Sequence, residues 1–218
     1  MCFNETASLV AFSIGVISTI VLFYMKLYKF AIFYISIFTM QLIEYYAHKS
    51  LKTNNIAMNK MSAYFGYFLI MSQPLLLSYL SFNDIPKELQ NTLLFLCLTY
   101  IIYGLYVFYK SYKSKQFKIS YLEKVCNNSV CRLNWEFFSV NFYNSLIIIL
   151  FYFGITFFIG CNRKSYNISI LFILTLLLGL TMISIISENK KLNIFGSLWC
   201  FVCVIAGPLV IMNKNLAI

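Results

Sequence analysis

The sequence predicts an all-α protein, a polytopic transmembrane helical bundle of seven spans that forms a single domain over residues 1–218. Hydrophobic residues make up 61% of the chain and charged residues 11%, whereas a soluble domain carries about 25% charged residues. The apolar residues form uninterrupted runs of about 20 residues, the length at which a helix crosses a bilayer. Strands of a membrane barrel would instead alternate in polarity over about 10 residues, so the runs favour helices.

Seven apolar runs are long enough to cross about 30 Å of hydrocarbon at about 1.5 Å of helix per residue. We place them at residues 7–25, 30–48, 61–82, 91–109, 137–160, 167–187 and 193–212. Pro74 in the third run and Pro208 in the seventh each remove one backbone hydrogen bond, and we expect a kink at each. Small residues recur every four positions in the first run and predict close approach of a second helix, at Ala7, Ala11, Gly15 and Thr19.

The net charge of +10 lies mainly in short connections between the apolar runs. Contact with the lipid bilayer explains this placement better than nucleic acid does, so no nucleic-acid partner is expected. The longest connection, residues 110–134, carries six basic residues and one acidic residue. We expect it to bind anionic lipid headgroups and to hold a short helix on the membrane surface.

The orientation follows from the distribution of Lys and Arg between the two sides. Eleven of these residues fall on the side of the N-terminus and six on the opposite side. Because basic residues are retained in the cytoplasm, we expect a cytoplasmic N-terminus and an exterior or lumenal C-terminus.

An ionisable residue inside a span is a functional hypothesis, because burying its charge costs about 2.5–3.5 kcal/mol at the centre of a helix. Glu44 is the clearest case, with Gln41 three residues before it and His48 four residues after it, all on one helical face. Glu44 could carry a proton, bind a cation or orient His48. The alternative is a protonated carboxyl group that links helices and has no further role.

Other polar residues fall in the same half of the predicted bundle. Asn141 and Asn144 open the fifth run, and Trp199 opens the seventh. Together with Glu44 they predict a polar cavity on the N-terminal side, in which Gln73, Asn144 and Gln41 would form hydrogen bonds with Glu44. The ligand, a small molecule or an ion, is not specified by these residues. Polar helix ends without a cavity are the alternative.

The cysteines suggest a second class of function. Residues 199–203 read W-C-F-V-C, so Cys200 and Cys203 could form a redox pair in a membrane-embedded thiol oxidoreductase, with Cys126 and Cys131 as a loop pair on the same side. Such chemistry needs a thiolate with a lowered pKa, and an apolar span acts in the opposite direction. Enzymatic activity is therefore the less favoured class, and no catalytic residue is assigned outside this alternative.

Several other functions find no motif in the sequence. The last span has no lysine for a retinal Schiff base, and the D-R-Y and N-P-x-x-Y strings of rhodopsin-class receptors are absent. His48 is the sole histidine, which excludes a di-histidine metal site within the chain. No nucleotide-binding loop and no hydrolase motif occurs. The sequence therefore predicts neither a metal site nor a cofactor.

Four short strings resemble an uncharacterised multi-pass membrane protein family of giant DNA viruses, with similar starts in bacterial proteins. Residues 1–8 resemble its M-C-F-S-x-x-A-S start, although Asn4 replaces the usual serine. Residues 40–44 resemble its M-Q-x-x-E segment, 72–74 a Q-P in its third span, and 196–200 its late G-S-x-W-C. The family has no settled activity. The resemblance implies a viral-type membrane protein and draws attention to six residues: Cys2, Gln41, Glu44, Gln73, Trp199 and Cys200.

The leading interpretation is a seven-span protein of the transporter, channel or receptor-like class with its charge-bearing centre at Glu44. The thiol oxidoreductase that uses Cys200 and Cys203 is the second interpretation. A structural viral membrane protein without any site is the third.

Overall fold

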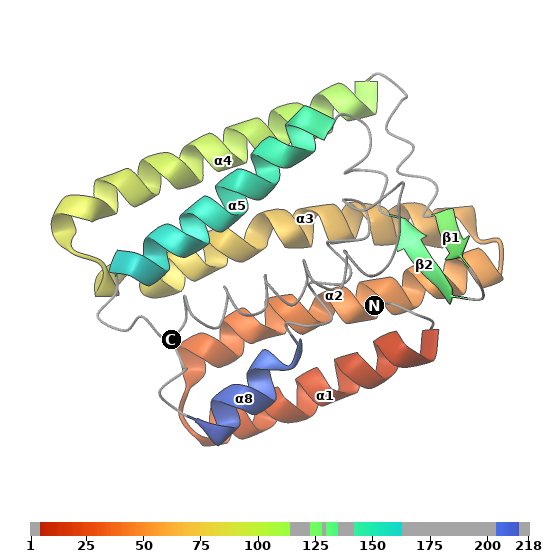
Figure 1. The fold of residues 1–218 in the computed structure, drawn as a ribbon, viewed down its shortest axis with the longest axis horizontal. Helices are drawn as coiled ribbons and strands as arrows, with labels where there is room; N and C mark the ends of the chain where they lie inside the picture. Colours follow the sequence, from red (N-terminus) through yellow and green to blue (C-terminus); the bar gives the residue numbers. More distant parts are fainter. Residues whose placement is uncertain (1–4, 114–122, 128–129, 135–141, 163–203, 214–218) are drawn as a thin grey trace.

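The computed structural model describes residues 5–113, 123–127, 130–134, 142–162 and 204–213, which form an elongated helical bundle (Figure 1). Helices account for most of the described residues, which also include one two-stranded hairpin. The elements in chain order are α1 (Glu5–Tyr24), α2 (Tyr28–Lys52), α3 (Ile56–Ser81), the 3-10 turn η1 (Phe82–Asp84), α4 (Lys87–Lys113), β1 (Glu123–Asn127), β2 (Val130–Asn134), α5 (Phe142–Asn162) and α8 (Ala206–Met212).

The first four predicted spans are confirmed as helices long and apolar enough to cross a membrane: Glu5–Tyr24, Tyr28–Lys52, Ile56–Asp84 and Lys87–Lys110. This is the architecture of a membrane-embedded protein. α5 overlaps the fifth predicted span and ends two residues beyond it, and its apolar part, Leu146–Asn162, is shorter than these four. The sixth predicted span, 167–187, lies outside the described residues, and of the seventh only the end around α8 is described. The count of seven is therefore not established by the structure.

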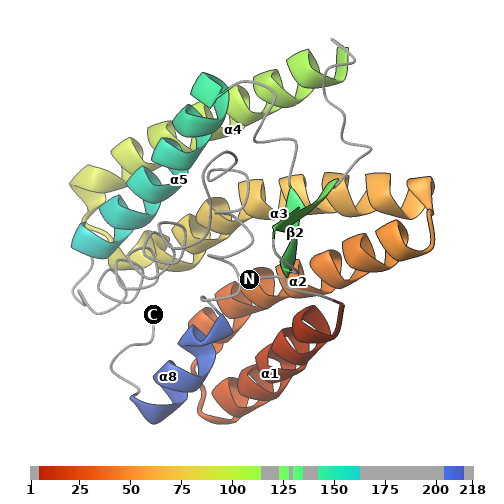
Figure 2. The same cartoon turned by 45° about the vertical axis from the view of Figure 1, so that its right-hand side comes forward.

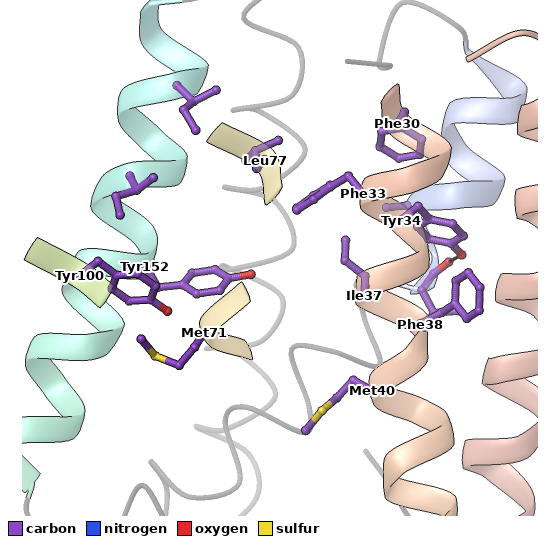
Figure 3. Close-up of a cluster of buried hydrophobic side chains, with 14 of the residues drawn as sticks. Phe30, Phe33, Tyr34, Ile37, Phe38, Met40, Met71, Leu77, Tyr100 and Tyr152 are labelled. Carbon is purple, nitrogen blue, oxygen red and sulfur yellow. Dashed lines mark hydrogen bonds between the residues drawn. The ribbon is translucent and has the colours of Figure 1, made fainter. Parts of the chain in front are cut away.

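The helices α1, α2 and α3 run antiparallel to their neighbours, with α2 between α1 and α3 (Figures 1 and 2). α4 and α5 pair with each other beside α3, and α8 packs against α1. α2 therefore has neighbours on two sides, and its aromatic side chains divide between them. Figure 3 shows Tyr34 and Phe38 on the side toward α1 and α8, whereas Phe33 and Ile37 point the other way.

The turns that join the first three helices depend on two residues with positive φ. Lys26 and Asn54 have φ values of 62° and 52°. In each turn the residue that follows donates a backbone hydrogen bond to the carbonyl five positions earlier, which closes the helix end: Leu27 to Leu22 and Asn55 to Ser50. The side chain of Asn55 then accepts from the Met58 amide and caps α3. α3 therefore begins at Ile56, earlier than the predicted 61.

The small residues predicted to allow close helix packing do so at Gly15. A Cβ atom built on Gly15 would lie 2.4 Å from Cγ of Phe38, a separation that real side chains do not adopt. Thus glycine is what allows α1 to approach the aromatic face of α2. Gly207 of α8 meets the Tyr34 ring in the same way, and the Tyr34 hydroxyl donates to the Val204 carbonyl at 2.5 Å.

The expectation of a surface helix in residues 110–134 differs from what the structure describes. α4 continues to Lys113, and β1 and β2 form an antiparallel hairpin beside α2 in which Cys126 lies opposite Cys131. The strands are joined by two residues, and each carries a valine next to its cysteine, a pattern that favours a hairpin over a helix. Apart from this short hairpin, the described elements are helical, as the all-α prediction expected.

The two prolines of the apolar runs have different surroundings. α3 continues through Pro74, and the hydroxyl group of Ser78 donates to the Pro74 carbonyl at 2.7 Å. Pro208 lies in the first turn of α8 and has no amide hydrogen to donate to the Val204 carbonyl four residues before it, which accepts from the Tyr34 hydroxyl group instead.

Candidate functional site

The three polar residues of α2 that the sequence places on one face all lie inside the molecule. Gln41 and Glu44 are both 0% exposed, and His48 is 7% exposed. Each of them has an interaction partner in the structure. The opposite face of α2, which includes Leu42 and Tyr46, is partly or fully exposed. The helix thus turns its polar face inward and an apolar face outward.

Two hydrogen bonds define the register between α2 and α3. Gln73 Nε2 donates to the Ser36 carbonyl at 3.0 Å, and Asn59 Nδ2 donates to the Ser50 hydroxyl group at 3.1 Å. Both pairs give the same antiparallel alignment, because Ser50 follows Ser36 by fourteen residues and Asn59 precedes Gln73 by fourteen. In that alignment Glu44, eight residues after Ser36, comes level with Phe65, eight residues before Gln73.

A third hydrogen bond places α5 in the same frame. The Tyr152 hydroxyl donates to Gln73 Oε1 at 2.8 Å. Since α3 and α5 run in the same direction, Asn144, eight residues before Tyr152, also comes level with Phe65. The predicted pair of Glu44 and Asn144 therefore shares one depth in the bundle, with α3 between the two helices that carry them.

Asn144 has a described partner at that depth. Its Oδ1 atom accepts from the hydroxyl group of Tyr103 at 2.9 Å, which links α5 to α4. The Tyr103 ring also lies against Phe151, with centroids 6.5 Å apart. Asn144 is thus part of a polar contact between α4 and α5 on one side of α3, whereas Glu44 lies on α2.

Gln73 belongs to a different level from Glu44. Eight residues of helix separate the two levels, which is about 12 Å along the axis. Gln73 is 1% exposed and uses both ends of its amide group, one on the Ser36 carbonyl and one on Tyr152. We expected a neighbour of Glu44, but the hydrogen bonds place Gln73 in a separate link that joins α2, α3 and α5.

The remaining site residues of the sequence prediction cannot be placed. Asn141, Trp199, Cys200 and Cys203 lie outside the described residues, so the proposed redox pair has no geometry to assess. In the hairpin, Cys126 and Cys131 are register partners across the two strands. Among the residues that the structure does describe, no group of three or more His, Cys, Asp or Glu side chains could hold a metal ion.

Two of the grooves on the described surface lie beside α3, and neither is lined by a predicted site residue. The larger, of about 840 Å³, lies between α2 and α3 and extends from Asn55 to Ser72. The smaller, of about 560 Å³, lies at the other end of the bundle near the ion pair of Lys29 and Asp84, whose atoms are 2.9 Å apart. The expected polar cavity around Glu44 is not one of these grooves.

Two residues that hold the Gln73 side chain, Ser36 and Tyr152, were not predicted from the sequence. The Ser36 contribution is a backbone carbonyl, for which the sequence carries no signal. Tyr152 stands in the apolar string L-F-Y-F-G at 150–154. A tyrosine in the middle of a span has a hydroxyl group that must find a partner inside the protein, so it could have been marked as a polar contact.

The chemistry available at the inner face of α2 is that of a carboxyl group, an amide and an imidazole enclosed in a membrane protein. Such a set can hold a proton or a small cation, because a buried carboxylate with an uncompensated charge is costly and either ligand neutralises that charge. Comparison with known proteins found no matching family model, no matching curated protein and no matching solved structure.

Proposed function

We propose that this protein is a transport-class integral membrane protein in which Glu44 binds and releases a proton or a small cation. The observation that carries the proposal is the burial of Glu44. It is 0% exposed within a membrane-length helix, with Gln41 and His48 on the same face. A carboxyl group of this kind is costly to keep in a span, which is why such residues commonly belong to ion or proton pathways.

The proposal includes seven spans, a cytoplasmic N-terminus and an exterior or lumenal C-terminus. The excess of basic residues on the N-terminal side supports this orientation. Glu5 and Lys52, 3.6 Å apart, show that the start of α1 and the end of α2 lie at the same end of the bundle. Glu44 is eight residues from Lys52, so its carboxyl group would lie nearer the cytoplasmic side.

The charge state of Glu44 would change during transport. With a proton bound, the carboxyl group is neutral and can donate a hydrogen bond. When the proton leaves, the carboxylate needs compensation from donors or from a cation. Gln41, one turn away on the same face, has an amide group that can donate to it, and His48 adds a group that can carry a positive charge.

A fixed structural role for Glu44 is the competing explanation, and Glu44→Gln separates the two. Glutamine has nearly the same shape and hydrogen-bonding capacity, but it cannot titrate. A structural carboxyl group should tolerate this change, whereas a proton or cation carrier should not. Glu88→Gln is the matched control, because Glu88 is exposed in the first turn of α4.

The experiment uses the full chain in proteoliposomes with a potassium diffusion potential as the driving force. An enclosed pH-sensitive dye measures proton flux, and an enclosed Na⁺-sensitive dye measures Na⁺ flux as the tested cation. We expect a proton or cation flux that falls at least tenfold in Glu44→Gln and is unchanged in Glu88→Gln. Equal flux in the wild type, in Glu44→Gln and in empty liposomes would contradict the proposal.

A further inference from the structure

The larger groove lies on the outside of the bundle, between the second half of α2 and the first two-thirds of α3. Its walls include Phe65 and Met61, which are 60% and 57% exposed. Asn55 lies at its shallow end and Ser72 at its deep end, and Tyr46 of α2 comes level with Ala63, about midway between them. The residues from Asn55 to Ser72 cover about 25 Å along α3. This exceeds half of a hydrocarbon core of about 30 Å, so a groove that opens in the interfacial region would reach the midplane.

The polar residues of the groove offer it little hydrogen-bonding capacity. The hydroxyl groups of Thr39, Ser62 and Ser72 donate to carbonyls of their own helices at 2.6, 2.9 and 2.8 Å. The Asn55 oxygen accepts from the Met58 amide at 3.0 Å. With these groups satisfied, the rest of the wall is hydrocarbon and aromatic surface. A polar substrate would find few partners here, whereas a hydrocarbon chain needs none.

A cationic side chain, outside the lining itself, stands beside the shallow half of the groove. Lys49 follows Tyr46 by three residues on α2, which places both on neighbouring positions of one helix face. Lys49 is exposed, and its ammonium group lies 5.9 Å from the centre of the Tyr45 ring. Lysine and tyrosine at this level are typical of the membrane interface, where phosphate groups of lipids lie.

We propose that this groove binds one acyl chain of a phospholipid from the leaflet on the N-terminal side, with the lipid phosphate group near Lys49. The depth of the groove matches a chain that runs from the interface to the midplane, and its walls match the chemistry of that chain. The site is separate from Glu44, which lies on the opposite, inner face of α2.

The test is photolabelling of the full chain in bilayers that contain phosphatidylglycerol with a diazirine on one acyl chain, followed by mass spectrometry of the labelled peptides. We expect labelling concentrated on residues 57–72 of α3. Ser72→Trp, which fills the deep end from an exposed position, should lower that labelling at least fivefold. Ile17→Trp is the matched control, because Ile17 is 63% exposed on α1, away from the groove.

Two results would overturn the proposal. Labelling spread evenly over the exposed apolar faces of α1, α3 and α4 would show only the lipid that surrounds any membrane protein. An equal loss in Ser72→Trp and Ile17→Trp would show a general effect of the added indole. The headgroup assignment has its own test: Lys49→Gln should lower labelling by about half, and unchanged labelling would remove Lys49 from the site.

Discussion

The polarity of the two faces of α2 is the opposite of that expected for a helix in a water-soluble protein. The inner face carries Gln41, Glu44 and His48, all buried. The outer face carries Leu42, Ile43 and Tyr46, which line an open apolar groove. In water, the outer residues would drive burial and the inner ones would remain solvated. In lipid, the apolar face needs no cover, and polar groups are most stable where the protein supplies their partners.

The same difference recurs in the links between helices. The described contacts that hold α2, α3, α4 and α5 together include hydrogen bonds between side chains and carbonyls, such as Tyr67 to the Gly104 carbonyl at 2.7 Å. Apolar side chains such as Phe65 and Ile17 instead point outward. Since hydrocarbon contacts are available everywhere in a bilayer, polar links and close packing supply the specificity of the bundle.

The largest expected effect comes from placing a charge on the outer face. Ile17→Asp should raise the apparent free energy of membrane insertion of α1 by about 3 kcal/mol, because Ile17 is near the middle of the helix and exposed to lipid. The measurement is a glycosylation-reporter insertion assay, with Ile17→Leu as the control. Unchanged insertion of Ile17→Asp would mean that this face does not lie in hydrocarbon, and the comparison of the two faces would fail.

A smaller effect should follow from adding one methyl group between packed helices. Gly15→Ala places a Cβ atom against Phe38, and we expect a loss of about 1–3 kcal/mol in the free energy of unfolding in detergent. Gly154 is the matched control, because a Cβ atom there has no neighbour within 4 Å. Gly154→Ala should be neutral or stabilising by about 1 kcal/mol, since alanine is the better helix former. Equal losses in the two variants would contradict close packing at Gly15.

The smallest effect concerns the Gln73 link. A double-mutant cycle of Gln73→Leu and Tyr152→Phe should give a coupling free energy of about 0.6–1.7 kcal/mol, the range of hydrogen bonds between membrane helices. Denaturation in mixed micelles measures each corner of the cycle. Strictly additive losses would show that the hydroxyl of Tyr152 does not stabilise the bundle through Gln73.

The positions of the first four helices could be predicted because hydropathy detects the hydrocarbon-crossing part of each. Their ends could not. α2 was expected to end at 48 but continues to Lys52, and α4 was expected to end at 109 but continues to Lys113. Helices extend into the interface, where lysine is tolerated because its ammonium group reaches water. Hydropathy therefore underestimates helix length at basic ends.

The candidate site was partly predictable for a similar reason. The spacing of Gln41, Glu44 and His48 along one helix gives a shared face, and their burial agrees with it. The position of Gln73 depended on a different kind of information. Its partners are a backbone carbonyl 37 residues away and a hydroxyl group 79 residues away. Such partners depend on helix register, which periodicity along one helix does not contain.

By itself, the sequence determined that this chain contains membrane-length apolar helices and that α2 has a polar face, because length and period are local properties of a helix in lipid. The tertiary structure decided which helices are neighbours, that Glu44 and Asn144 share a depth while Gln73 does not, and that an apolar groove lies on the outside of α2 and α3. These features depend on the register and close approach of segments far apart in the chain, as at Gly15 and Phe38.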